Sequence, residues 1–89
     1  MKHIVKRSGR TEAYDERKLY ASIYAACLAV REPVGAAELV AERVCADMQD
    51  WLKPKSEVSS TDIRTHATKY LKQLNEHAAF LYAHHRIMW

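Results

Sequence analysis

Apolar residues recur every three or four positions along most of the chain beyond residue 14, which predicts amphipathic helices. Asp15 is expected to cap the first helix, because its carboxylate can accept the free backbone N–H groups of the next turn. Pro33 is expected to end that helix at residues 31–33, since the residue before a proline avoids the α region. The positions predicted to face the core are Leu19, Ile23, Ala26, Cys27 and Val30.

The same spacing predicts a second helix that begins near Gly35 and ends at Lys53-Pro54. Its predicted core face consists of Leu39, Val40, Val44, Met48, Trp51 and Leu52.

A third helix is predicted with Ser60 or Thr61 as its cap. Its predicted core face consists of Ile63, Ala67, Tyr70, Leu71 and Leu74. A break at Asn75-Glu76 is expected to precede a last helix over residues 78–89.

The first fourteen residues differ from the rest, because two short segments flank Ser8-Gly9 and so predict a β-hairpin. If Val5 faces the helices, strand alternation turns Lys6 away from them and Arg7 towards them. Glu57-Val58 can add a further short strand. The expected fold is therefore α+β and mainly α, with a small β-hairpin or three-stranded sheet capping a four-helix bundle. We expect residues 1–89 to form one domain.

Composition narrows the class of protein without indicating a function. The 89 residues are 48% hydrophobic and 28% charged, which excludes a disordered chain, a collagen-like repeat and a disulfide-built miniprotein. Cys27 and Cys45 lie far apart without zinc-ligand spacing, and nothing indicates an oxidising compartment. The chain has no apolar run as long as a membrane span and no signal-peptide core at its start, so we expect a cytoplasmic protein.

Candidate chemistry gathers around the predicted hairpin turn. Lys and Arg number 14 against 11 acidic residues, a mild excess that is compatible with an anionic partner. The run from Lys6 to Arg10 surrounds a glycine turn with cations, and Lys18 lies one turn into the first helix, so together they could hold a phosphate. By composition alone, a solvated basic turn is the simpler interpretation.

Other candidate sites are weaker. His84 and His85 are adjacent and diverge on a helix, and His77 lies two turns from His84, so a polar helix surface explains them better than a metal site. No catalytic motif or spaced pair of acids is found, so no enzyme is expected. Tyr20 with Tyr24, and the apolar terminus 87–89, could form interaction surfaces.

The order of residues at the start of the chain resembles that of ATP-cone domains. Residues 5–10, V-K-R-S-G-R, resemble the family run V-x-K-R-D-G-R, with Ser8 where the aspartate stands. Tyr14-Asp15 and Lys18-Leu19 follow as the family's F-D and K-L do, and residues 71–76 are similar to its L-K-x-L-D-E. In residues 78–86, Ala79 and Leu81 stand where the repressor group of the family has tyrosine and arginine. The resemblance covers essentially the whole chain.

This resemblance implies a regulatory module that binds ATP or dATP, with magnesium only as a companion of the phosphates. Such domains occur in ribonucleotide reductase large subunits and in the repressor of reductase genes, where the nucleotide acts by changing the oligomer. The partners implied are therefore a second copy, a reductase or another regulated protein, and no membrane.

The resemblance also assigns roles to single residues. Lys6, Arg7 and Lys18 are implied as phosphate ligands, and Val5 and Leu19 as walls of the adenine pocket. The remaining implied contacts are Glu12 to the adenine amino group, Asp15 to the sugar-phosphate side, and Ser60 and Arg64 from the helical bundle. Two alternatives are a small basic nucleic-acid-binding module and a helical interaction domain without a nucleotide. Against the first, the basic residues do not share one helix face.

Overall fold

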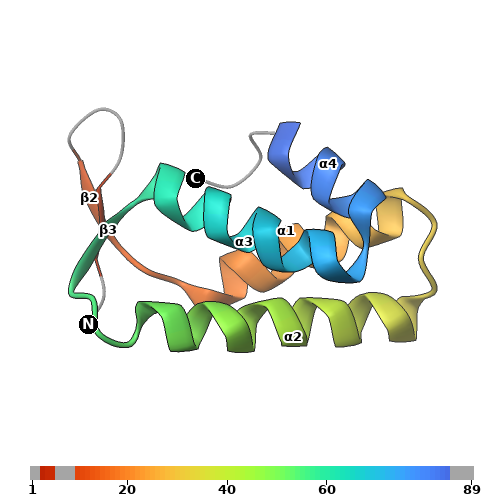
Figure 1. The fold of residues 1–89 in the computed structure, drawn as a ribbon, viewed down its shortest axis with the longest axis horizontal. Coiled ribbons are helices and arrows are strands. Elements are labelled where there is room, and N and C mark those ends of the chain that lie inside the picture. The colour runs from red at the N-terminus through yellow and green to blue at the C-terminus, as the bar shows by residue number, and fades with distance from the viewer. Residues whose placement is uncertain (1–2, 6–9, 85–89) are drawn as a thin grey trace.

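The computed structural model describes residues 3–5 and 10–84, and the elements follow the predicted order (Figure 1). In chain order they are β1 (His3–Val5), β2 (Thr11–Ala13), α1 (Glu16–Ala29), α2 (Val34–Leu52), β3 (Glu57–Ser59), α3 (Ser60–Leu74) and α4 (Glu76–His84).

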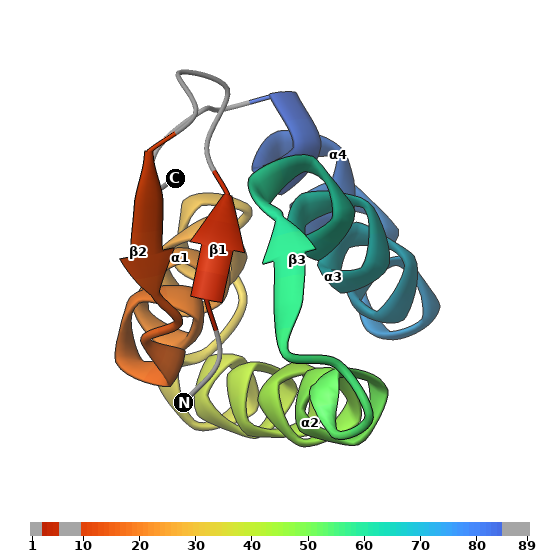
Figure 2. The ribbon, with the colours of Figure 1, turned by 90° about the vertical axis from the view of Figure 1, so that its left-hand side faces the viewer.

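The strands form a mixed sheet in the order β2-β1-β3, which caps one end of the helices (Figures 1 and 2). β1 and β2 are antiparallel, which confirms the predicted hairpin strands, although the turn between them lies outside the described residues. β3 confirms the strand expected at Glu57-Val58 and pairs parallel with β1, so the three-stranded form of the prediction is the one adopted.

Ile4 is the residue of β1 that faces the helices, since its side chain is fully buried. Its partners across the sheet are Glu12 on β2 and Val58 on β3, and directly paired residues lie on the same face. Val5 follows Ile4 and strand side chains alternate between the two faces, so the condition considered from the sequence, that Val5 faces the helices, is not met.

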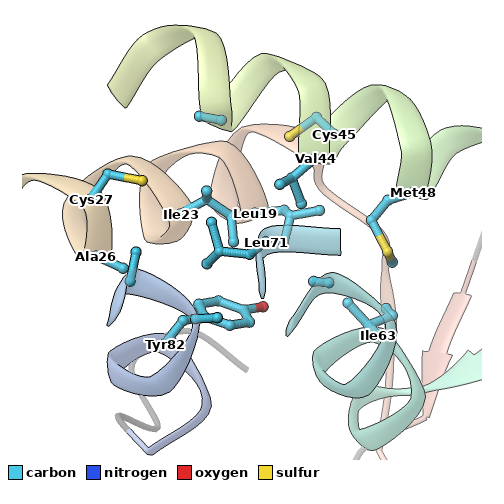
Figure 3. Close-up of a cluster of buried hydrophobic side chains, with 14 of the residues drawn as sticks. Leu19, Ile23, Ala26, Cys27, Val44, Cys45, Met48, Ile63, Leu71 and Tyr82 are labelled. Atoms are coloured by element: carbon cyan, nitrogen blue, oxygen red, sulfur yellow. The ribbon is translucent and has the colours of Figure 1, made fainter. Parts of the chain in front are cut away.

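The helices form a bundle in which α1 packs on α2 and α4, and α3 packs on the same two helices. Figure 3 shows their apolar side chains converging in one cluster. In α1 the predicted face is confirmed, with Val30 half-buried at its end. In α2, Val44, Met48 and Leu52 are buried as predicted, with Val40 and Trp51 partly buried against them.

The prediction that Leu39 and Leu74 face the core is wrong. Leu39 of α2 is 68% exposed, because the buried positions of the helix at this level are occupied by small residues, Ala37, Ala41 and Cys45. Leu74, at the last position of α3, is 44% exposed, whereas Ile63, Ala67 and Leu71 are buried as predicted and Tyr70 is half-buried.

Several helix ends follow from local hydrogen bonds. The carboxylate of Asp15 accepts from the backbone N–H of Arg17 at 2.9 Å, which confirms the predicted cap. The cap of α3 is Ser59, and the expectation of Ser60 or Thr61 is wrong by one residue or two. Ser59 keeps the extended backbone of β3, so its hydroxyl is placed to accept from the N–H of Asp62 at 3.0 Å.

The last helix begins two residues earlier than predicted. Asn75 caps it by accepting from the N–H of Ala78 at 3.0 Å, so the predicted break is confirmed at Asn75, while Glu76 is already the first residue of the helix. The predicted apolar terminus 87–89 lies outside the described residues. Among the residues that are described, no helix has the length and apolar character to cross a bilayer.

Candidate functional site

Parallel pairing brings two of the predicted site residues together at one edge of the sheet. Val5 ends β1 and is paired with Ser59, the residue just before Ser60. The carboxyl ends of β1 and β3 therefore lie side by side, as Figure 2 shows. Lys6 and Arg7, which follow Val5 directly, lie outside the described residues.

Arg64 extends this group along α3. It lies four residues after Ser60, so the two side chains occupy neighbouring turns on one side of the helix. The guanidinium carbon of Arg64 lies 5.9 Å from the centre of the Tyr82 ring, which belongs to α4. A cation over an aromatic face is an attractive contact, so Tyr82 helps to place Arg64.

Sequence reasoning missed Tyr82, although a signal was present. Ala78, Ala79 and Tyr82 follow helical spacing and are the buried residues of α4. In Figure 3 the Tyr82 ring reaches from α4 towards Leu71 and the centre of the apolar cluster.

The first turn of α1 holds a second group. The Asp15 carboxylate caps the helix and also accepts from Arg17 Nε at 3.5 Å. The hydrogen bond from the Arg17 backbone, followed by the Arg17 charge, lowers the pKa of Asp15 and keeps the carboxyl ionised. Lys18 is exposed, while Leu19 is fully buried. The side chain of Lys18 therefore reaches solvent, and that of its neighbour Leu19 packs in the core.

The two groups do not lie at the same end of the sheet. β2 runs opposite to β1, so Asp15 follows the edge where Ala13 is paired with His3, away from Val5. Glu12 lies between the two groups on the helix-facing side, opposite Ile4. The predicted site residues are therefore spread along the end of the bundle that faces the sheet, from one end of the strands to the other.

A sequence model of the family described as ATP cone domain matches residues 2–89 of this chain. The chain belongs to the ATP-cone family. This finding confirms the resemblance, and it makes the chain a nucleotide-binding regulatory module rather than a catalytic domain. A comparison with curated protein sequences gives no significant match.

Three open depressions that are lined by described residues of this ATP-cone lie elsewhere. The one beside the first turn of α1, of about 330 Å³, is lined by Glu16, Arg17, Tyr20, Glu42, Cys45, Ala46 and Gln49. Others are lined by Tyr14 with the end of α2, and by Leu39, Val40 and Leu74 between α2 and α3. None of these linings includes a residue that the sequence assigns to the nucleotide.

The cysteines of this ATP-cone belong to the core. Cys27 is fully buried, which confirms its predicted place, and burial with the nearby Glu32 carboxylate raises the pKa of its thiol to about 11. Burial raises the pKa of Cys45 to about 12. Both thiols therefore stay protonated and unreactive near neutral pH. Among the described residues, no three histidine, cysteine or acidic side chains gather as metal ligands.

Proposed function

We propose that this ATP-cone binds ATP or dATP along the sheet-facing end of the bundle and signals its occupancy by a change of oligomer or to a partner protein. The observation that carries the proposal is the parallel pairing of β1 with β3, which sets Ser60 beside the end of the strand that leads into Lys6-Arg7. The end of β1 and the start of α3, which are distant in sequence, thus meet at one edge of the sheet.

Cations from three elements would hold the phosphates. Lys6 and Arg7 follow β1, Lys18 lies on the first turn of α1, and Arg64 lies one turn into α3. A phosphate near Lys18 also gains from the positive amino end of α1. Magnesium would enter with the phosphates, since it is usually held by phosphate oxygens and water in such sites.

The base would lie nearer the helix-facing side of the sheet. Glu12 is on that side, where its carboxylate can accept a hydrogen bond from the adenine amino group. Leu19 is fully buried in the core. The β1 side chain on the same face is Ile4, so we propose Ile4, in place of Val5, as the apolar wall from the sheet.

Calorimetric titration with ATP tests this assignment. Charge-assisted contacts are worth roughly 1.5–3 kcal/mol, so Lys6→Ala and Arg64→Ala should each weaken ATP binding by about tenfold to a hundredfold. Lys72→Ala is the matched control, because Lys72 is an exposed cation in the last turn of α3, away from the sheet.

The melting temperature of the free Lys6→Ala protein should stay nearly unchanged. Equal ATP affinities for Lys6→Ala, Arg64→Ala and Lys72→Ala would show that the phosphates bind elsewhere. A protein that binds no ATP at all would contradict the proposed function.

A further inference from the structure

Trp51 is contacted by aromatic and cationic groups from two other parts of the chain. It lies in the last turn of α2 and stacks on His66 of α3, with ring centres 4.0 Å apart and an interplanar angle of 28°. Lys55 places its Nζ 4.7 Å from the centre of the same ring. All three residues are half-buried. We call Trp51, Lys55 and His66 the Trp51 clamp.

The clamp holds the short link between α2 and β3. The link is anchored to α2 by the N–H of Lys55, which donates to the carbonyl of Leu52 at 2.9 Å. The carbonyl of Ser56 accepts from the N–H of His3 at 3.2 Å, so the link is tied to β1 as well. The position of Trp51 therefore affects where β3 begins and how β3 pairs with β1.

The clamp also affects how α3 is rotated about its own axis. At about 100° per residue, Arg64 and His66 point about 200° apart, on either side of the buried stripe through Ile63 and Ala67. Arg64 meets Tyr82 of α4, and His66 meets Trp51 of α2. A helix moves as a rigid unit over two turns, so a rotation that displaces Arg64 also displaces His66.

We propose that the Trp51 clamp is a positioning device that fixes the rotation of α3 in which Ser60 and Arg64 meet the nucleotide. This inference rests on the proposed function. Trp51, Lys55 and His66 act through α3 and β3 and need not touch the nucleotide. Binding and stacking are then linked, so that the clamp strengthens nucleotide binding and the bound nucleotide stabilises the clamp by the same factor.

The affinity for ATP decides the proposal. Residues that act at a distance change coupling by about 0.5–2 kcal/mol, so His66→Ala should weaken ATP binding by about two- to thirtyfold. His66→Phe should restore most of the affinity, because a phenyl ring can still stack on Trp51. His77→Ala is the matched control, since His77 is an exposed histidine of α4.

A second readout follows Trp51 itself. The chain has two tryptophans, so Trp89→Phe leaves Trp51 as the only one. In that protein, saturating ATP should change the Trp51 emission, and His66→Ala should reduce this change. Circular dichroism at the titration temperature checks that each variant is folded, and Trp51→Leu, which removes the aromatic ring but keeps an apolar side chain, serves as a second clamp variant should His66→Ala not fold.

The outcomes separate the two proposals. If the unmodified protein binds ATP and the folded clamp variants bind it equally well, the positioning role is overturned and nucleotide binding stands. If the unmodified protein does not bind ATP, the proposed function fails, and the positioning role fails with it. Weaker binding by His66→Ala, with recovery by His66→Phe, supports both.

Discussion

At the scale of single residues, Arg31 carries the backbone conformation that ends α1. Its φ is 66°, in the left-handed region that glycine tolerates best. The N–H of Arg31 donates to the carbonyl of Leu28 at 2.9 Å, and that of Glu32 donates to the carbonyl of Cys27 at 3.0 Å. This pair of bonds is a Schellman motif, which ends the helix before Pro33 has any influence.

Arg31→Gly is expected to raise the free energy of unfolding by about 0.5–1 kcal/mol, because the left-handed penalty of about 1–2 kcal/mol is partly offset by the greater freedom of glycine in the unfolded chain. Urea unfolding measures the change. Arg31→Ala keeps the Cβ and should bring no comparable gain. A loss of stability in Arg31→Gly would contradict this account of the helix end.

The buried thiols make the protein sensitive to alkali. The Cys27 pKa is raised from 9.0 to about 11, so between these values the unfolded chain has released a proton that the native chain keeps. The unfolded state therefore binds fewer protons, and stability falls as pH rises through this range, by up to about 3 kcal/mol for Cys27. Cys45 acts in the same direction. Urea unfolding at pH 7.5 and at pH 10.5 measures the fall, and Cys27→Ala should make it smaller. A stability that does not fall with rising pH would contradict the buried, protonated thiols.

At the scale of elements, Asn75 joins the two corners at the far end of the bundle from the sheet. Its Nδ2 donates to the carboxylate of Glu32, in the loop between α1 and α2, and its Oδ1 caps α4 at Ala78. Its backbone N–H donates to the carbonyl of Leu71 at 2.7 Å and so closes α3. One side chain thus fixes the start of α4, the helix that carries Tyr82.

Asn75→Ala should lower the free energy of unfolding by about 2–3 kcal/mol, since it removes a helix cap and the donor to a partly buried carboxylate. Asn75→Asp keeps the capping oxygen but sets a second carboxylate against Glu32. Its free energy of unfolding should therefore lie between that of Asn75→Ala and that of the unmodified protein. Thermal unfolding compares the three. An Asp variant less stable than the Ala variant would mean that repulsion from Glu32 outweighs the cap.

The elements themselves were largely predictable, because the large apolar residues that follow helical spacing are buried in the core. Examples are Leu19, Ile23, Ile63 and Leu71. The failures have separate physical causes. The search for helical spacing considered mainly large residues, so it selected Leu39 and missed the alanines that α2 buries, Ala37 and Ala41. The parallel pairing of β1 with β3 joins residues more than fifty positions apart, and no local pattern encodes it. The resemblance supplied the site residues, but only the burial of Ile4 shows which face of β1 meets the helices.

At the scale of the whole molecule, the sheet-facing end would take the nucleotide, and the helices leave apolar surface for a partner. Phe80 of α4 and Leu39 of α2 are each 68% exposed, and Leu74 of α3 is 44% exposed. Surface of this kind favours association when it is contiguous. A bound nucleotide can shift an association equilibrium only by its difference in affinity for the two states.

Light scattering with and without ATP or dATP is expected to show a change in average mass, because the nucleotide should favour one oligomer. Calorimetry on the same samples establishes that the nucleotide is bound. An unchanged monomer with nucleotide bound would rule out self-association and leave signalling through a partner protein.

The central claim is that an adenine nucleotide binds along the sheet-facing end of this ATP-cone. A crystal structure of the protein with ATP and Mg²⁺ tests it most directly. We predict phosphates beside Lys6, Arg7, Lys18 and Arg64, and the adenine amino group within hydrogen-bonding distance of Glu12. Nucleotide bound in the groove between α2 and α3, or the absence of electron density for a nucleotide under saturating ATP, would contradict the account.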